Sequence, residues 1–160
     1  MGKGQGGVIY STPATGQEFS LVEHHRVSAP IRPRPQSRPR VLKSGLVISS
    51  TKHVARMKRD LITAVRASRP PAPPPADVPL HLAVECTMPI LSPRRHGQLH
   101  TGRPDADNLV KAIKDAIVDA QLIADDSQIA VVEVAKLYGP PPGAIALTLS
   151  RIESPPANDN

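Results

Sequence analysis

The chain has 160 residues, enough for one compact domain with tails, and carries 20 Lys and Arg against 14 acidic residues, a formal charge of +6 at pH 7. This positive excess favours a polyanionic partner such as nucleic acid, while one Phe, two Tyr and no Trp argue against a single-strand-binding module that stacks bases. No apolar run approaches the roughly 20 residues of a membrane helix, and the start is glycine-rich and polar, so we expect a cytoplasmic protein without membrane contact.

The N-terminal third is expected to be largely irregular. Residues 1–22 mix Gly, Ser, Thr and Gln without periodicity, which predicts a flexible arm. Residues 31–40 alternate Arg and Pro, which favours an extended backbone with separated guanidinium groups. Such a segment suits phosphate contacts, and Arg38 and Arg40 are its candidate DNA-binding residues.

A short strand and a basic helix are predicted next. Residues 45–50 favour the strand, and Ser50 or Thr51 is a suitable N-cap for a helix that runs to about Ala67. Apolar residues recur in the helix at helical spacing and predict a core-facing stripe. Its basic faces fit a solvated surface and a DNA contact equally well.

Residues 70–79 form a proline-rich connector, and residues 80–90 then alternate apolar side chains at period two, as a strand does. Cys86 falls in this strand as a buried core residue. A single cysteine forms neither an internal disulfide nor a cysteine zinc site, consistent with a reducing compartment.

A polar loop over residues 92–102 contains Arg94 and Arg95, which we interpret as phosphate-facing DNA-binding residues. Its two histidines, His96 and His100, have the spacing of zinc ligands on a helix, but the proline and glycines around them oppose a helix and no third soft ligand is present.

The second helix is the clearest predicted element, because six apolar residues from Leu109 to Ala120 share one helical face. Asp107 is its expected N-cap. Residues 129–137 and 144–152 predict two strands joined by a Gly-Pro-Pro-Pro-Gly turn short enough for antiparallel pairing, and residues 154–160 a disordered tail.

Carboxylates concentrate around this helix. Asp105 and Asp107 precede it, separated by one residue, and Asp125 and Asp126 follow it. If the loop after the helix returns to its start, three or four carboxylates converge and need a cation to offset their repulsion. Hard divalent ions with oxygen ligands do this, so the sequence predicts a site for Mg²⁺, with Mn²⁺ as a substitute.

The motif Asp105-Ala106-Asp107-Asn108-Leu109, followed by Lys111, Asp125-Asp126 and Gln128, resembles the signature of the RusA family of Holliday-junction resolvases. These are small dimeric endonucleases of phages and prophages. Upstream, Pro35-Gln36-Ser37-Arg38-Pro39-Arg40 resembles the Pro-x-x-Arg-Pro-Arg stretch near the start of such proteins, so the resemblance spans residues 26–152.

The resemblance implies that Asp105, Asp107 and Asp126 are the essential carboxylates, with Lys111 assisting catalysis and Asp125 as a neighbouring metal ligand. It also implies that Lys136 contacts DNA, and Arg103 of the motif is a further DNA-binding candidate. Asn108 and Gln128 would shape the site by hydrogen bonding. Residues 120–122 depart from the family pattern, since many relatives have a glycine-containing turn there.

We therefore expect an α+β domain over residues 23–153, with a small mixed β-sheet and two principal helices packed against it. The resemblance implies a homodimer, whose two symmetric active sites would deliver the paired nicks that resolve a junction in DNA recombination and repair. The expected partner is a four-way junction or other branched DNA.

One alternative to the nuclease site can be excluded on sequence, and others remain open. An EF-hand fails because Val110 stands where its loop needs glycine and Ala116 where it needs glutamate. Helix capping by Asp107 and an ordinary Lys111–Asp115 surface pair would make the acids structural. A non-catalytic branched-DNA-binding protein, or a nuclease that cuts flaps by the same chemistry, would share the basic surface.

Overall fold

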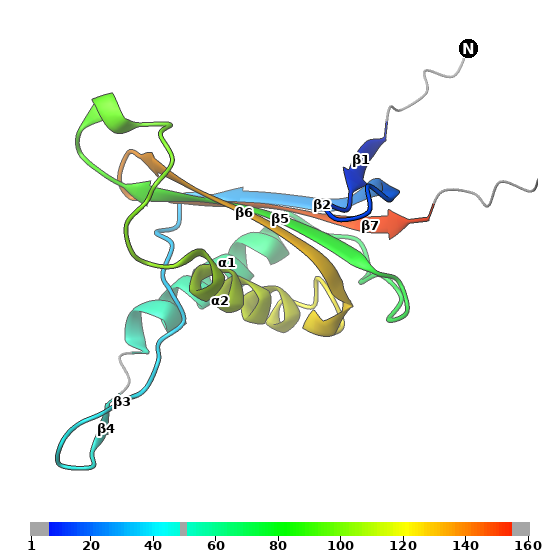
Figure 1. The fold of residues 1–160 in the computed structure, drawn as a ribbon. Coiled ribbons are helices and arrows are strands. Elements are labelled where there is room, and N and C mark those ends of the chain that lie inside the picture. The colour runs from blue at the N-terminus through cyan, green and yellow to red at the C-terminus, as the bar shows by residue number, and fades with distance from the viewer. Residues whose placement is uncertain (1–6, 49–50, 155–160) are drawn as a thin grey trace, which may run out of the picture.

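Two helices pack against one face of a five-stranded mixed sheet in this computed structural model, which describes residues 7–48 and 51–154 (Figure 1). The elements, with η for a short 3-10 helix, are β1 (Val8–Ser11), β2 (Glu18–Ala29), β3 (Arg40–Val41), β4 (Val47–Ile48), α1 (Lys52–Ala67), β5 (Leu80–Pro89), η1 (Pro93–Arg95), α2 (Ala106–Asp119), η2 (Asp126–Gln128), β6 (Ile129–Gly139) and β7 (Ala144–Glu153). The predicted α+β class with two principal helices is confirmed. No helix in the described ranges is long and apolar enough to cross a membrane.

The strand order of the sheet is β1-β2-β7-β5-β6, so β5 lies between β7 and the edge strand β6. It pairs in parallel with β6 and antiparallel with β7. The predicted direct pairing of β6 with β7 is therefore wrong. The helical crossover through α2 returns the chain parallel to β5 on one side, so β7 can reach β5 only on the other.

The core lies between the helices and the sheet. The predicted apolar stripes are confirmed, since both helices bury them against β5 and β7, and Cys86 is fully buried, which raises the pKa of its thiol to about 12. The buried helix residues include Val54, Met57, Leu61, Val65, Leu109, Ile113 and Ile117. Across the helix pair, Lys58 Nζ donates to Asp115 Oδ2 at 3.1 Å.

The N-terminal arm predicted over residues 1–22 does not hold for the part that the structure describes. Residues 8–11 form β1, and β2 begins at Glu18 and pairs with β7 over nearly its whole length. Backbone pairing rather than an apolar alternation organises this segment, because only Leu21, Val27 and Ala29 of β2 are buried. Residues 1–6 and most of the predicted tail, 155–160, lie outside the described residues.

A small hairpin projects from the body between β2 and α1 (Figure 1). The predicted strand over residues 45–50 appears as β4, which pairs with β3, and residues 49–50 lie outside the described ranges. Residues 30–39 before the hairpin have no regular structure, as the Arg-Pro alternation predicts. α1 begins directly after Thr51, which occupies its N-cap position.

The end of α2 shows how residues 120–122 form a turn without the glycine that many relatives have there. Gln121 has a φ of 61°, and the N–H groups of Gln121 and Leu122 donate to the carbonyls of Val118 and Ile117 at 2.9 and 3.0 Å. This is the bonding of a Schellman cap, in which glycine normally takes the left-handed position.

Replacing Gln121 by glycine is expected to raise the free energy of unfolding by up to about 1 kcal/mol, because glycine adopts positive φ without steric cost. Urea unfolding would measure the change. Gln121→Ala is the matched control, since it shortens the side chain but keeps Cβ. A glycine variant no more stable than the alanine variant would contradict a strained cap.

Candidate active site and nucleic-acid interface

The first acid pair lies at the start of α2. Asp105, with extended backbone angles, occupies the N-cap position, and its carbonyl accepts from the Leu109 N–H at 3.3 Å. Asp107 lies in the first helical turn, so its predicted capping role is wrong, because the chain is already helical from Ala106. Both aspartates are exposed, and neither side chain has a hydrogen bond or ion pair among the described residues.

Lys111 lies one turn after Asp107 and is also exposed. The alternative role as partner of Asp115 is not what the structure shows, because Asp115 accepts from Lys58 on α1. The ammonium of Lys111 therefore remains available beside the first acid pair, on the same helical face as Asp107.

The second acid pair lies after α2. Asp125 Oδ1 accepts from the Ser127 N–H at 2.7 Å, and hydrogen bonding by the Ser127 side chain and backbone lowers the pKa of Asp125. Asp126 Oδ2 is 4.0 Å from Lys114 Nζ. These acids line a hollow of about 310 Å³ with residues of α1 and the second half of α2, namely Lys58, Asp115, Val118 and Asp119.

The two acid pairs do not meet within one chain. Among the described residues, no group of three His, Cys, Asp or Glu side chains is placed to hold a metal ion, so the expected convergence of three or four carboxylates is not found within one chain. Asp107 and Asp115 are eight positions apart, about 12 Å along the axis of α2. The following loop cannot return to the start of the helix, because Leu122 and Ile123 anchor it in the core.

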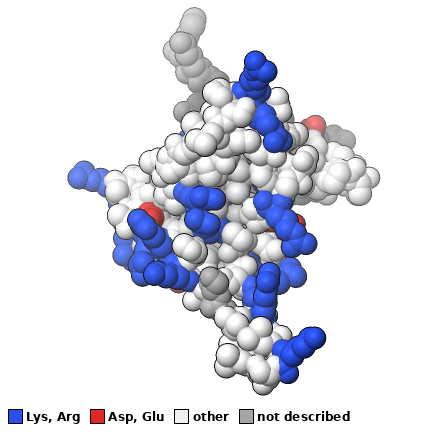
Figure 2. Space-filling view, turned by 90° about the vertical axis from the view of Figure 1, so that its left-hand side faces the viewer, with Lys and Arg blue, Asp and Glu red and all other residues white. Residues whose placement is uncertain are grey.

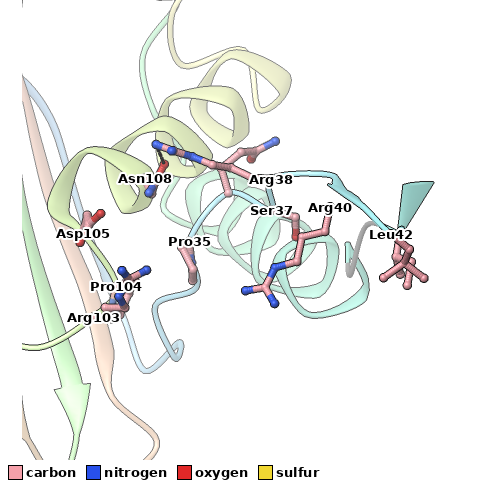
Figure 3. Close-up of a pocket in the computed structure, with 11 residues that line it drawn as sticks. Pro35, Ser37, Arg38, Arg40, Leu42, Arg103, Pro104, Asp105 and Asn108 are labelled. Carbon is pink, nitrogen blue, oxygen red and sulfur yellow. Dashed lines mark hydrogen bonds between the residues drawn. The ribbon is translucent and has the colours of Figure 1, made fainter. Parts of the chain in front are cut away.

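A groove joins Asp105 of the first acid pair to the Arg-Pro segment. It has a volume of about 730 Å³, and Arg38, Arg40, Arg103 and Asp105 all line it (Figure 3). These residues come from segments more than 60 positions apart in the sequence, and the fold brings them together.

Hydrogen bonds fix the two walls of the groove to each other. The Gln36 N–H donates to the Asn108 carbonyl at 3.0 Å, and Arg38 Nη2 lies 3.4 Å from Asn108 Oδ1 (Figure 3). Asn108 therefore ties the extended segment to α2. A hydrogen-bonding role for Asn108 was expected, and this contact is one it makes.

The family follows from comparison with known proteins. Residues 30–148 match the family described as Endodeoxyribonuclease RusA, a range that includes the groove, both acid pairs and Lys111. The chain belongs to the RusA family. A stretch of 61 residues is also 39% identical to the crossover junction endodeoxyribonuclease rusA of Lactococcus phage r1t, covering 38% of this chain and 47% of that protein. The match thus spans about half the length of the curated relative.

This RusA-family chain concentrates Lys and Arg on the face that carries the β3–β4 hairpin and the loop between β5 and α2 (Figures 1 and 2). Another hollow, of about 250 Å³, is lined by Arg32, Arg34, Arg56 and His53 among others and adds basic residues that were not named as individual DNA-binding candidates. Arg32 and Arg34 belong to the Arg-Pro segment that is expected to suit phosphate contacts.

One of the two arginines in the loop between β5 and α2 that were expected to face DNA phosphates contacts the protein itself. Arg95 lies over the ring of Tyr138, with Cζ 4.0 Å from the ring centroid, whereas no charged partner is present for Arg94 among the described residues. The His100 ring contacts the same ring in a tilted arrangement, with 4.6 Å between centroids, and partial burial, Lys136 and Arg95 lower the pKa of His100.

Two further predicted residues have protein partners. Lys136 Nζ donates to the carbonyls of Gly102 and Pro104, both at 2.8 Å. Gln128, the last residue of η2, is buried, and its Nε2 donates to the Pro75 carbonyl at 2.8 Å. This bond anchors the proline-rich connector to η2. Neither contact could be read from the sequence, because each joins segments that only the fold brings together.

Proposed function

We propose that this RusA-family chain is a metal-dependent endodeoxyribonuclease that resolves Holliday junctions by paired nicks. The observation that carries the proposal is the groove, in which Asp105 shares one surface with Arg38, Arg40 and Arg103. A carboxylate suited to a divalent ion thus lies beside guanidinium groups suited to DNA phosphates. The printed name of the phage relative, a crossover junction endodeoxyribonuclease, supports the choice of substrate.

Each group has a distinct task in this proposal. Arg38, Arg40 and Arg103 hold phosphates of the DNA backbone in the groove, while Asp105 and Asp107 supply oxygen ligands for Mg²⁺ or Mn²⁺. The bound ion would supply a lower pKa for the attacking water and stabilisation of the leaving 3′ oxygen. Lys111 would add positive charge where negative charge develops on the phosphate.

The first acid pair fits a metal but does not complete a site. Asp105 and Asp107 are exposed and keep their carboxylate oxygens free of protein partners among the described residues. Two carboxylates leave most positions around a hard cation to water, substrate or further ligands. The second pair, Asp125 and Asp126, is equally exposed but lies beside the other half of α2.

A two-fold homodimer would bring the first and second acid pairs together. If α2 of one protomer runs antiparallel to α2 of its partner, the first acid pair of each lies near the second acid pair of the other. Two identical sites would result, related by the dimer axis. Such symmetry matches the paired nicks proposed for the four-way junction.

The direct test is incubation of the purified protein with a labelled four-way junction, a flap and a linear duplex of matched sequence, each with Mg²⁺ or with EDTA. Paired nicks confined to the junction, abolished by EDTA, would support the proposal. Cleavage of the flap alone would identify a different branched substrate. Binding without metal-dependent cleavage would favour the non-catalytic DNA-binding alternative, in keeping with the incomplete acid set of one chain.

The groove arginines yield a separate prediction. Arg40→Gln is expected to weaken binding to junctions of different sequence about equally and to reduce the slope of log affinity against log salt by about 1, as for loss of one phosphate contact. Fluorescence anisotropy over a salt series would measure both. Arg26→Gln is the control, because Arg26 lies on β2 in an ion pair with Glu23. Equal effects of the two substitutions would contradict a specific role for the groove.

A further inference from the structure

The loop that leads into the first acid pair is attached to the edge of β6. The His100 N–H donates to the Lys136 carbonyl at 2.8 Å, and the Tyr138 N–H donates to the Gln98 carbonyl at 2.9 Å. Gly97 N–H in turn donates to the Tyr138 carbonyl at 2.8 Å. These bonds make residues 97–100 a short extension of the sheet, and the chain then turns toward α2.

Lys136 continues this attachment beyond the last backbone bond. Its ammonium donates to two carbonyls of the same loop, those of Gly102 and Pro104, at 2.8 Å each. Hydrogen bonds with an ionised donor are stronger than neutral ones. The Pro104 carbonyl belongs to the peptide bond that joins Pro104 to Asp105, so the ammonium fixes the peptide immediately before the N-cap of α2.

These contacts compete with a role in DNA binding. An ammonium has three N–H donors, and two are already directed at carbonyls, so only one remains for a phosphate. The Lys136 side chain is also partly buried, unlike the exposed arginine Arg94. Moving Lys136 onto DNA would leave both carbonyls without this donor.

We infer that Lys136 is a positioning residue, which fixes the backbone of residues 102–104 and thereby the direction of the Asp105 carboxylate. The inference rests on the proposed function in one respect, namely that Asp105 is a metal ligand. It assigns the lysine to the geometry of the acid pair and not to the DNA interface.

The first experiment examines the loop without reference to activity. Lys136→Met keeps most of the side-chain length but removes the ammonium, and Lys136→Arg keeps a cationic donor. Amide hydrogen exchange, followed by mass spectrometry, should be faster in Lys136→Met for peptides covering residues 100–109, and unchanged for β7. Lys136→Arg should restore part of the protection. Unchanged exchange in the methionine variant would overturn the inference.

The second experiment separates positioning from DNA contact. Junction affinity and its salt dependence, measured in EDTA, should be the same for Lys136→Met and the wild-type protein. Single-turnover cleavage should fall by about 10- to 100-fold, and the Mg²⁺ concentration for half-maximal rate should rise, as expected when the support of a metal ligand is lost. Lys136→Arg should recover part of both.

The outcomes distinguish the inference from its alternatives. Weaker junction affinity with a salt slope reduced by about 1 would make Lys136 a phosphate contact and overturn the positioning role. A reduced rate at an unchanged Mg²⁺ requirement would overturn it as well. Were the wild-type protein to cut no junction, the proposed function would fail, whereas the exchange comparison would still decide whether Lys136 holds the loop.

Discussion

Asp107→Asn is expected to reduce Mg²⁺-dependent cleavage of a four-way junction by more than about 100-fold. The substitution removes one of the two carboxylates that the first acid pair would offer to the metal ion. Asparagine matches aspartate in shape, so the start of α2 should be preserved. Binding of the junction in EDTA should not weaken, since a negative charge is lost near the groove. Single-turnover cleavage and anisotropy would measure the two effects.

Glu18→Gln is the matched control for that prediction. It removes the same charge from an exposed residue at the start of β2, in the part of the sheet that carries β1. The control should keep the wild-type cleavage rate. Comparable activity in Asp107→Asn and Glu18→Gln would show that Asp107 is no metal ligand, whereas a loss of binding by Asp107→Asn alone would point to misfolding of the helix start.

Periodicity predicted those elements whose side chains face a single core. The stripe from Leu109 to Ile117 defines α2, and the alternation from Leu80 to Cys86 defines β5, because burial on one face leaves a repeating pattern in the sequence. The N-terminal strands escaped prediction because β1 and much of β2 are held by backbone pairing and bury few apolar side chains.

The candidate site shows a different limit. Residue types and spacing single out Asp105 and Asp107 as candidates, but the direction of the chain after α2 depends on Leu122 and Ile123, which the core buries. Sequence spacing carries no information on that direction. Lys136 illustrates the same limit, because its partners at residues 102–104 are more than 30 positions away and are reached only through the edge of β6.

The separation of the acid pairs makes a dimer testable through mixed subunits. Asp107→Asn and Asp126→Asn homodimers should both be inactive. In a heterodimer with shared sites, one site would combine both defects, and the other would combine the intact first pair of one protomer with the intact second pair of its partner. The heterodimer should therefore nick one strand at about half the wild-type total rate, since one of two symmetric sites is intact.

Two affinity tags on co-expressed chains would isolate that heterodimer, and a denaturing gel of the labelled junction would count its nicks. Sites formed within single chains predict no recovery, because each site would then hold one defect. Absence of any doubly tagged species would instead contradict the homodimer. Recovery of single nicks without paired ones would show that each site combines Asp107 of one protomer with Asp126 of the other. Helix α2 would then separate two sites, with one acid pair near each of its ends.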